Sequence, residues 1–242
     1  MDLKDKAILI TGAGKRIGAE LAKAIAGKGA QVAIHYNRSE KDAKTVARAI
    51  EKKGGIATLT KGDLSKPADC ARIVKETMKA FGRLDVLINN AAVFYKTPLL
   101  QTTEKQWDHT LGANLKSVFF CAQAAAKVMP EGGKIINIAD WSAVRPHKNY
   151  IPYCISKAGV IALTRGLART LAPKITVNAI SPGPILLPED YDEATKENLI
   201  RQTPLKRIGC PNDLVSAVLF LLEGTDFMTG STITVDGGRL VA

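Results

Sequence analysis

The sequence predicts one α/β domain in which helices cover both faces of a parallel sheet, the doubly wound arrangement. Seven short runs rich in aliphatic and β-branched residues alternate with longer amphipathic stretches over the 242 residues. The short runs are apolar nearly throughout, as expected for strands that are buried on both faces. Because no Pro/Ser-rich linker or internal repeat divides the chain, residues 1–242 are expected to form a single domain.

The predicted elements alternate regularly along the chain. In residues 15–28, Ile17, Leu21 and Ile25 recur on one helical face, which predicts the first helix. Residues 184–210 break the alternation with a connection that is too long for a simple loop, and long connections often serve as substrate lids. The predicted strands are 6–11, 30–36, 55–61, 84–89, 133–139, 174–180 and 231–236, and the other predicted helices are about 40–53, 66–81, 104–129, 151–171 and 211–223.

Composition limits the partners that the chain is expected to have. The net charge is +11, but basic residues such as Lys44 and Arg48 alternate with acids such as Glu40 and Asp42, which indicates a solvated helix face. No apolar run reaches the roughly 18 residues of a membrane span. The four cysteines are isolated and lack the spacing of a metal site. We therefore expect a cytoplasmic protein with no metal, no nucleic-acid partner and no membrane partner.

A glycine-rich turn follows the first predicted strand and precedes the first predicted helix. It reads Thr11-Gly12-Ala13-Gly14-Lys15-Arg16-Ile17-Gly18. Glycines at this point let backbone N–H groups approach a pyrophosphate at the start of a helix. This context predicts a Rossmann-type domain of about seven strands that binds a dinucleotide.

The end of the second predicted strand indicates which dinucleotide is bound. A carboxylate at this point would bind the free ribose hydroxyls of NAD, but the chain has Tyr36, Asn37, Arg38 and Ser39 before its first acid, Glu40. A guanidinium and a hydroxyl suit a 2′-phosphate, so we expect NADP(H). The alternative is that Arg38 is an ordinary surface arginine and that Ser39 only caps the next helix.

A group of three residues that follow the fifth predicted strand indicates a site for proton transfer. Tyr153 and Lys157 are four residues apart and share one face of the helix predicted at 151–171. The ammonium group is expected to lower the pKa of Tyr153 and make it a proton relay. Asp140 is expected within hydrogen-bond reach of the Tyr153 hydroxyl or of the substrate ring, where a protonated carboxyl could donate to a ring nitrogen. The alternative for Asp140 is that it caps a turn at the end of the strand.

Across essentially the whole chain, these motifs resemble the short-chain dehydrogenase/reductase family. The resemblance implies that Asn114, Tyr153 and Lys157 are the catalytic Asn, Tyr and Lys of that family. It also implies a homotetramer with the helices at 104–129 and 151–171 at one interface. The cofactor-binding residues that we expect are Gly12, Arg16, Ile17, Tyr36, Asn37, Arg38, Ser39, Asp63, Leu64, Asn90, Ala91, Ala92, Tyr153, Lys157, Pro182 and Gly183.

Two departures from that family resemble its pteridine reductase subfamily. Arg16 replaces a usual glycine, and Asp140 replaces the usual catalytic serine. The resemblance implies that Phe94 stacks on the pterin and that Arg16 contacts both pterin and cofactor phosphate. The expected substrate residues are therefore Arg16, Phe94, Asp140 and Tyr153, and Asp140 joins the catalytic set. Trp141 follows the aspartate at a position where smaller side chains are common.

The sequence thus favours an NADPH-dependent reductase of a dihydropterin or dihydrofolate type of substrate. Hydride addition to a ring C=N leaves negative charge on nitrogen, which an acid such as Asp140 would neutralise. One alternative is an NADPH-dependent carbonyl reductase of 3-oxoacyl thioesters or sugars. A non-enzymatic alternative is an NADP-binding regulatory protein, against which the intact Asn114, Tyr153 and Lys157 argue.

Overall fold

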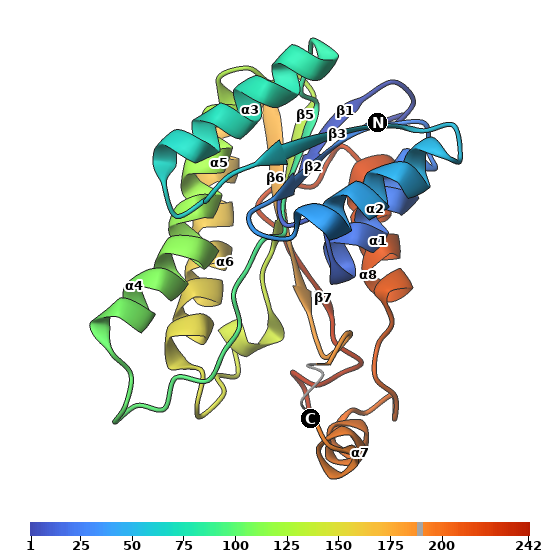
Figure 1. Ribbon diagram of the computed structural model, residues 1–242. Helices are drawn as coiled ribbons and strands as arrows, with labels where there is room; N and C mark the ends of the chain where they lie inside the picture. The colour runs from blue at the N-terminus through green and yellow to red at the C-terminus, as the bar shows by residue number, and fades with distance from the viewer. Residues whose placement is uncertain (188–190) are drawn as a thin grey trace.

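A seven-stranded sheet with all neighbouring strands parallel forms the centre of the molecule (Figure 1). The computed structural model describes residues 1–187 and 191–242. The strands are β1 (Ala7–Ile10), β2 (Gln31–Tyr36), β3 (Ile56–Lys61), β4 (Val86–Asn89), β5 (Gly133–Ile138), β6 (Ile175–Pro182) and β7 (Thr232–Val235). Their spatial order is β3-β2-β1-β4-β5-β6-β7, which confirms the predicted doubly wound, Rossmann-type fold.

Helices cover both faces of this sheet (Figure 1). One layer contains α1 (Arg16–Ala26), α2 (Glu40–Glu51) and α8 (Pro211–Leu219), and the other contains α3 (Pro67–Phe81), α5 (Ser117–Ala126) and α6 (Ile151–Leu171). In β1, Ile8 and Ile10 pack with the first layer, whereas Leu9 packs with the second. Because successive side chains of a strand point to opposite faces, both sets must be apolar, which explains the continuous apolar runs.

Two predicted helices are interrupted in the structure. The helix predicted at 104–129 consists of α4 (Glu104–Leu111), a π-helical turn (Gly112–Lys116) and α5. In the helix predicted at 211–223, α8 ends at Leu219 and a second π-helical turn follows at Phe220–Gly224. A π turn adds one residue to the hydrogen-bonded ring without changing the apolar character of the segment, so hydrophobic periodicity did not reveal it. None of the described helices is long and apolar enough to cross a membrane.

The predicted lid at 184–210 contains a helix that the sequence pattern did not reveal. Helix α7 (Glu193–Gln202) begins where the Asp192 carboxylate accepts a hydrogen bond of 2.8 Å from the Thr195 N–H. None of its residues is fully buried, so it lacks the apolar stripe on which helix prediction depends. Residues 188–190 of the predicted lid lie outside the described residues.

Candidate active site

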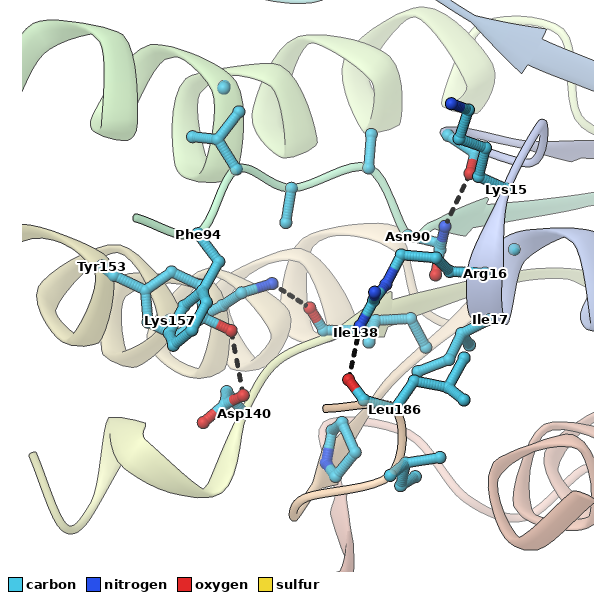
Figure 2. A pocket seen from close by; sticks show the side chains of 18 of the residues that line it. Lys15, Arg16, Ile17, Asn90, Phe94, Ile138, Asp140, Tyr153, Lys157 and Leu186 are labelled. Atoms are coloured by element: carbon cyan, nitrogen blue, oxygen red, sulfur yellow. Dashed lines mark hydrogen bonds between the residues drawn. The ribbon is translucent and has the colours of Figure 1, made fainter. Parts of the chain in front are cut away.

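A cavity of about 680 Å³ opens where the carboxyl ends of the central strands meet. The strand order reverses between β1 and β4, and ligands of doubly wound sheets bind at such switch points. Figure 2 shows part of its lining, with Asp140, Tyr153 and Lys157 near Phe94, and with Arg16 reaching toward Leu186. All residues predicted to bind cofactor or substrate line this cavity.

The glycine turn at the start of α1 fits a dinucleotide. Gly12 has φ +65°, and a Cβ at this position would lie 2.9 Å from the Cα of Ala91. A Cβ at Gly18 would lie 2.4 Å from the Gly12 carbonyl oxygen. Only glycine permits these close approaches, and the turn leads into the amino end of α1, where a helix favours an anionic ligand.

Arg16 occupies this turn in a backbone conformation that favours glycine, with φ 51°. Its guanidinium donates a hydrogen bond to the carbonyl oxygen of Leu186, which follows β6 (Figure 2). Arg16 therefore connects the turn at the start of α1 to the beginning of the 184–210 segment. Arg16 and Leu186 both line the cavity, so a ligand that binds the Arg16 guanidinium would also lie next to the Arg16–Leu186 hydrogen bond.

Arg38 and Ser39 lie at the cavity wall between β2 and α2. Ser39 directly precedes α2, but its side chain makes no capping hydrogen bond, so capping does not explain its presence. A Cβ at Gly14 would lie 3.1 Å from the Ser39 hydroxyl oxygen, which shows that this hydroxyl faces the glycine turn. The arrangement suits a phosphate that would lie between the turn and the end of β2.

Asp140 lies two residues after β5 and uses both of its carboxyl oxygens. Its Oδ2 accepts a hydrogen bond of 2.9 Å from the Tyr153 hydroxyl (Figure 2), which confirms the predicted proximity of the two groups. Its Oδ1 accepts one of 2.8 Å from the Ser142 N–H and caps a short 3₁₀ turn at Trp141–Ala143. The two interpretations of Asp140 are therefore compatible, because the capping bond orients the carboxyl toward the tyrosine.

The predicted fall in the pKa of Tyr153 is wrong for this arrangement. Burial raises the pKa of Tyr153 well above its usual value, and the neighbouring Asp140 raises it further. Lys157 does not reverse this effect, since its Nζ lies 5.7 Å from the centre of the phenol ring and donates to the Ile138 carbonyl oxygen at 2.7 Å. Burial also lowers the pKa of Lys157 to about 8.

Phe94 forms an aromatic wall next to this centre. Its ring stacks on Tyr150 with the centroids 4.4 Å apart and the planes 4° from parallel. It meets Tyr153 edge-on at 4.8 Å. Phe94 is 42% exposed and lines the cavity, so it is not a core residue.

Asn114 is not part of the cavity lining. It lies fully buried in the π-helical turn, where its Oδ1 accepts a hydrogen bond of 2.8 Å from the Val93 N–H. Its Nδ2 donates to the Val93 carbonyl oxygen at 3.0 Å and to the Ser156 hydroxyl at 3.3 Å. Asn114 therefore holds the backbone between Ala92 and Phe94, both of which line the cavity.

The cavity also contains residues that sequence reasoning missed. Most belong to loops or to faces of elements with no distinctive pattern, so no local signal identified them. They are His35, Gly62, Ser65, Val93, His109, Ala113, Ile138, Ala139 and His147. The other lining residues belong to segments that the sequence did indicate: Lys15 and Gly18 to the glycine turn, Trp141 to the position after Asp140, and Pro184, Ile185, Leu186, Leu187, Tyr191 and Leu199 to the predicted lid.

His35 is one of these residues and makes stability depend on pH. The buried ring accepts a hydrogen bond of 3.1 Å from the Gly12 N–H at Nδ1, and Nε2 donates to the Gly62 carbonyl oxygen at 3.1 Å. Burial lowers the pKa of His35 from 6.5 to about 4. Between these values the unfolded chain binds more protons than the native protein, so the stabilisation present above pH 6.5 is lost as pH falls toward about 4.

We expect this loss to be about 3 kcal/mol in the free energy of unfolding. Urea unfolding of the original protein and of His35→Gln across this pH range measures it, with His109→Gln as a histidine control. The variant should be less stable at neutral pH and should lack most of the acid-dependent loss. An equal loss in His35→Gln and the original protein would show that other groups cause it.

The fold and this cavity together define a nucleotide-binding oxidoreductase of the doubly wound α/β class. A family model described as enoyl-(acyl carrier protein) reductase matches residues 12–239. A 3-oxoacyl-(acyl-carrier-protein) reductase FabG of Staphylococcus aureus is 36% identical over 239 residues, which are 96% of this chain and 97% of that protein. The chain belongs to the short-chain dehydrogenase/reductase family, whose members are NAD(P)-dependent oxidoreductases.

Solved structures agree with this assignment. A short-chain dehydrogenase/reductase from Serratia marcescens superposes with a TM-score of 0.94 at 33% identity, over 99% of this chain and 100% of that chain. FolM alternative dihydrofolate reductase 1 from Brucella canis, complexed with NADP, superposes with a TM-score of 0.93 at 31% identity. That comparison covers 100% of this chain and 96% of the Brucella chain.

Proposed function

We propose that the protein is an NADPH-dependent pteridine reductase that reduces a ring C=N of a dihydropterin or dihydrofolate type of substrate. The main support is the hydrogen bond of 2.9 Å between Asp140 and the Tyr153 hydroxyl inside the cavity. A carboxyl that carries a proton at this position can give it to nitrogen, whereas the serine hydroxyl that is usual in the family is a far weaker acid. The structural similarity to the Brucella canis FolM protein adds support.

NADPH, when bound, supplies the hydride for this reaction. Gly12, Arg16, Arg38 and Ser39 would hold its phosphates, and Pro182 and Gly183 would lie beside its nicotinamide. The product also needs one proton on nitrogen. The Tyr153 hydroxyl donates to Asp140 in the structure, so the two groups are placed to pass this proton between them. We therefore assign the proton to Asp140, passed directly or through Tyr153.

Reduction of 3-oxoacyl thioesters is the second candidate function. It is favoured by the 36% identity to the Staphylococcus aureus enzyme over nearly the full length of both chains. The two candidates are separated by following NADPH oxidation with dihydrobiopterin, dihydrofolate and an acetoacetyl thioester in parallel. Faster turnover of the thioester than of either pterin would reject the pteridine proposal.

We expect NADPH to bind more tightly than NADH, because Arg38 and Ser39 would contact the 2′-phosphate. A charge-assisted hydrogen bond contributes about 1.5–3 kcal/mol, which is roughly 10- to 150-fold in affinity. Since Arg38 is exposed, the lower end of this range applies. Arg38→Ala should remove most of the preference, and Arg48→Ala, an exposed arginine of α2 outside the cavity, should leave it intact. Fluorescence titration with both cofactors measures it, and equal affinities in the original protein would contradict the assignment.

Phe94 is proposed to stack on the flat ring of the substrate. Stacking contributes about 0.5–1.5 kcal/mol beyond the buried area, so Phe94→Ala should weaken pterin binding by at least 2- to 12-fold. Phe94→Leu keeps most of the apolar area but has no aromatic face. Its pterin affinity should lie between that of the original protein and that of Phe94→Ala. NADPH affinity should not change in either variant. Calorimetric titration of pterin into the NADP complex provides the measurement, and unchanged pterin affinity in Phe94→Ala would exclude stacking.

The resemblance to the family also leads us to propose a homotetramer in the cytoplasm, assembled through the α4–α5 and α6 region. Trp107 of α4, Phe119 of α5 and Ile155 of α6 are each about two-fifths exposed and would supply apolar surface to such an interface. We further propose that the 184–210 segment closes over the substrate.

A further inference from the structure

Arg239 lies near the end of the chain and is 6% exposed, although a guanidinium is costly to bury without partners. Its partners are on α7. Its Nη1 donates to the Leu199 carbonyl oxygen at 3.1 Å and to the Thr203 hydroxyl at 3.4 Å, and its Nη2 donates to the Gln202 side chain at 3.2 Å. The guanidinium therefore caps the carboxyl end of α7, where the helix dipole favours a cation.

Helix α7 buries little of its own surface against the described residues. It is ten residues long, none of them fully buried, and helices of this length are marginal without packing. Leu199 nevertheless lines the cavity, so the position of α7 shapes one of its walls. The attachment through Arg239 consequently affects the cavity itself.

The Arg239 guanidinium also contacts the ring of Trp141. The guanidinium carbon lies 4.7 Å from the centre of a Trp141 ring, within cation–π range. Trp141 is 6% exposed, lines the cavity and directly follows Asp140, on the turn that the Asp140 carboxylate caps. Arg239 is thus held between two parts of the cavity wall that are far apart in sequence, the Asp140–Trp141 turn and α7.

We propose that Arg239 is a positioning residue that clamps α7 onto Trp141 and thereby sets the shape of the substrate end of the cavity. The proposal rests on the proposed function only in that a substrate is reduced beside Asp140. It explains the unusual tryptophan after Asp140, since a small side chain there could not reach the guanidinium. The clamp acts on substrate binding and leaves the cofactor end, at the other side of the cavity, unchanged.

The test uses Arg239→Met, which keeps the length of the side chain and removes its charge and donors. In the free protein, amide hydrogen exchange of α7 should become faster. The KM for whichever of dihydrobiopterin or the acetoacetyl thioester is turned over should rise about 5- to 30-fold. The kcat should fall less than threefold and the NADPH affinity should not change. Arg201→Met, an exposed arginine on α7 itself, is the matched control and should change none of these quantities.

Trp141 provides a second, independent test. Trp141→Leu should raise the KM as Arg239→Met does, whereas Trp141→Phe should have a KM close to that of the original protein. In the double variant Arg239→Met/Trp141→Leu, the KM should not exceed that of the more severe single variant. Unchanged α7 exchange in both Arg239→Met and Trp141→Leu would overturn the clamp. Faster exchange with an unchanged KM, or an equal loss of substrate and NADPH affinity, would show a merely structural role and overturn the positioning. The exchange measurement needs no substrate, so it stays decisive even if neither compound is reduced.

Discussion

Asp140→Asn is expected to bind NADPH with unchanged affinity and to reduce pterins about 10²–10⁴-fold more slowly, the usual contribution of a positioned acid. Asparagine keeps the shape of the side chain, and one of its two polar atoms can still meet the Ser142 N–H that fixes the turn. The asparagine amide, however, cannot act as an acid toward the substrate nitrogen. Single-turnover oxidation of bound NADPH in the presence of dihydrobiopterin measures the hydride-transfer step directly, with cofactor affinity measured separately.

Asp140→Ser is the matched variant, because it restores the residue that is usual in the family. We expect pterin reduction to fall by a similar factor, while reduction of an acetoacetyl thioester is retained or increases. If Asp140→Ser reduces pterins as fast as the original protein, the carboxyl is not the acid. The proposal of a pteridine substrate would then lose its main support, and the 3-oxoacyl candidate would replace it.

The second large effect is expected from Lys157, whose charge should be required for turnover. Burial lowers the pKa of Lys157 to about 8, and the nearby Asp140 partly opposes this change. The value of kcat/KM reports groups of the free enzyme, so loss of the Lys157 proton should make it fall tenfold per pH unit above about pH 8. Between pH 8 and about pH 10 the loss should reach roughly 100-fold.

Lys157→Met should abolish this pH dependence and lower kcat/KM at neutral pH by about 10²-fold or more, since the neutral side chain cannot compensate charge beside Tyr153. Lys148→Met, at an exposed site outside the cavity lining, should retain both the rate and the pH profile. Initial rates at low substrate concentration across this pH range provide the measurement. A profile that stays level above pH 8 would show that turnover does not need the protonated lysine.

Several features could be predicted from the sequence because their causes are local or follow from strand geometry. Gly12 and Gly18 are required by steric limits that act over a few residues, and they identify the nucleotide turn without knowledge of the rest of the chain. Asp140 follows a strand of the central sheet, and the carboxyl ends of parallel strands meet at one edge. Its proximity to Tyr153 was therefore predictable, and the hydrogen bond confirms it.

Other features depended on contacts that no local pattern records. Helix α7 has no buried face and is held from outside by Arg239, so its sequence did not distinguish it from a loop. The pKa of Tyr153 was predicted to fall from the spacing to Lys157 alone. Burial and the carboxylate of Asp140 instead raise it, since the dielectric environment of a side chain is set by everything that surrounds it.

The sequence by itself thus determined the doubly wound fold, the nucleotide turn and the group of Asp140, Tyr153 and Lys157, because periodicity, glycine sterics and strand ends act along the chain. Only the tertiary structure decided which groups are hydrogen-bonded to each other, how deeply Lys157 is buried, and that Arg239 joins α7 to Trp141. These properties arise between residues distant in sequence, whose separation in space is fixed only when the whole core has packed.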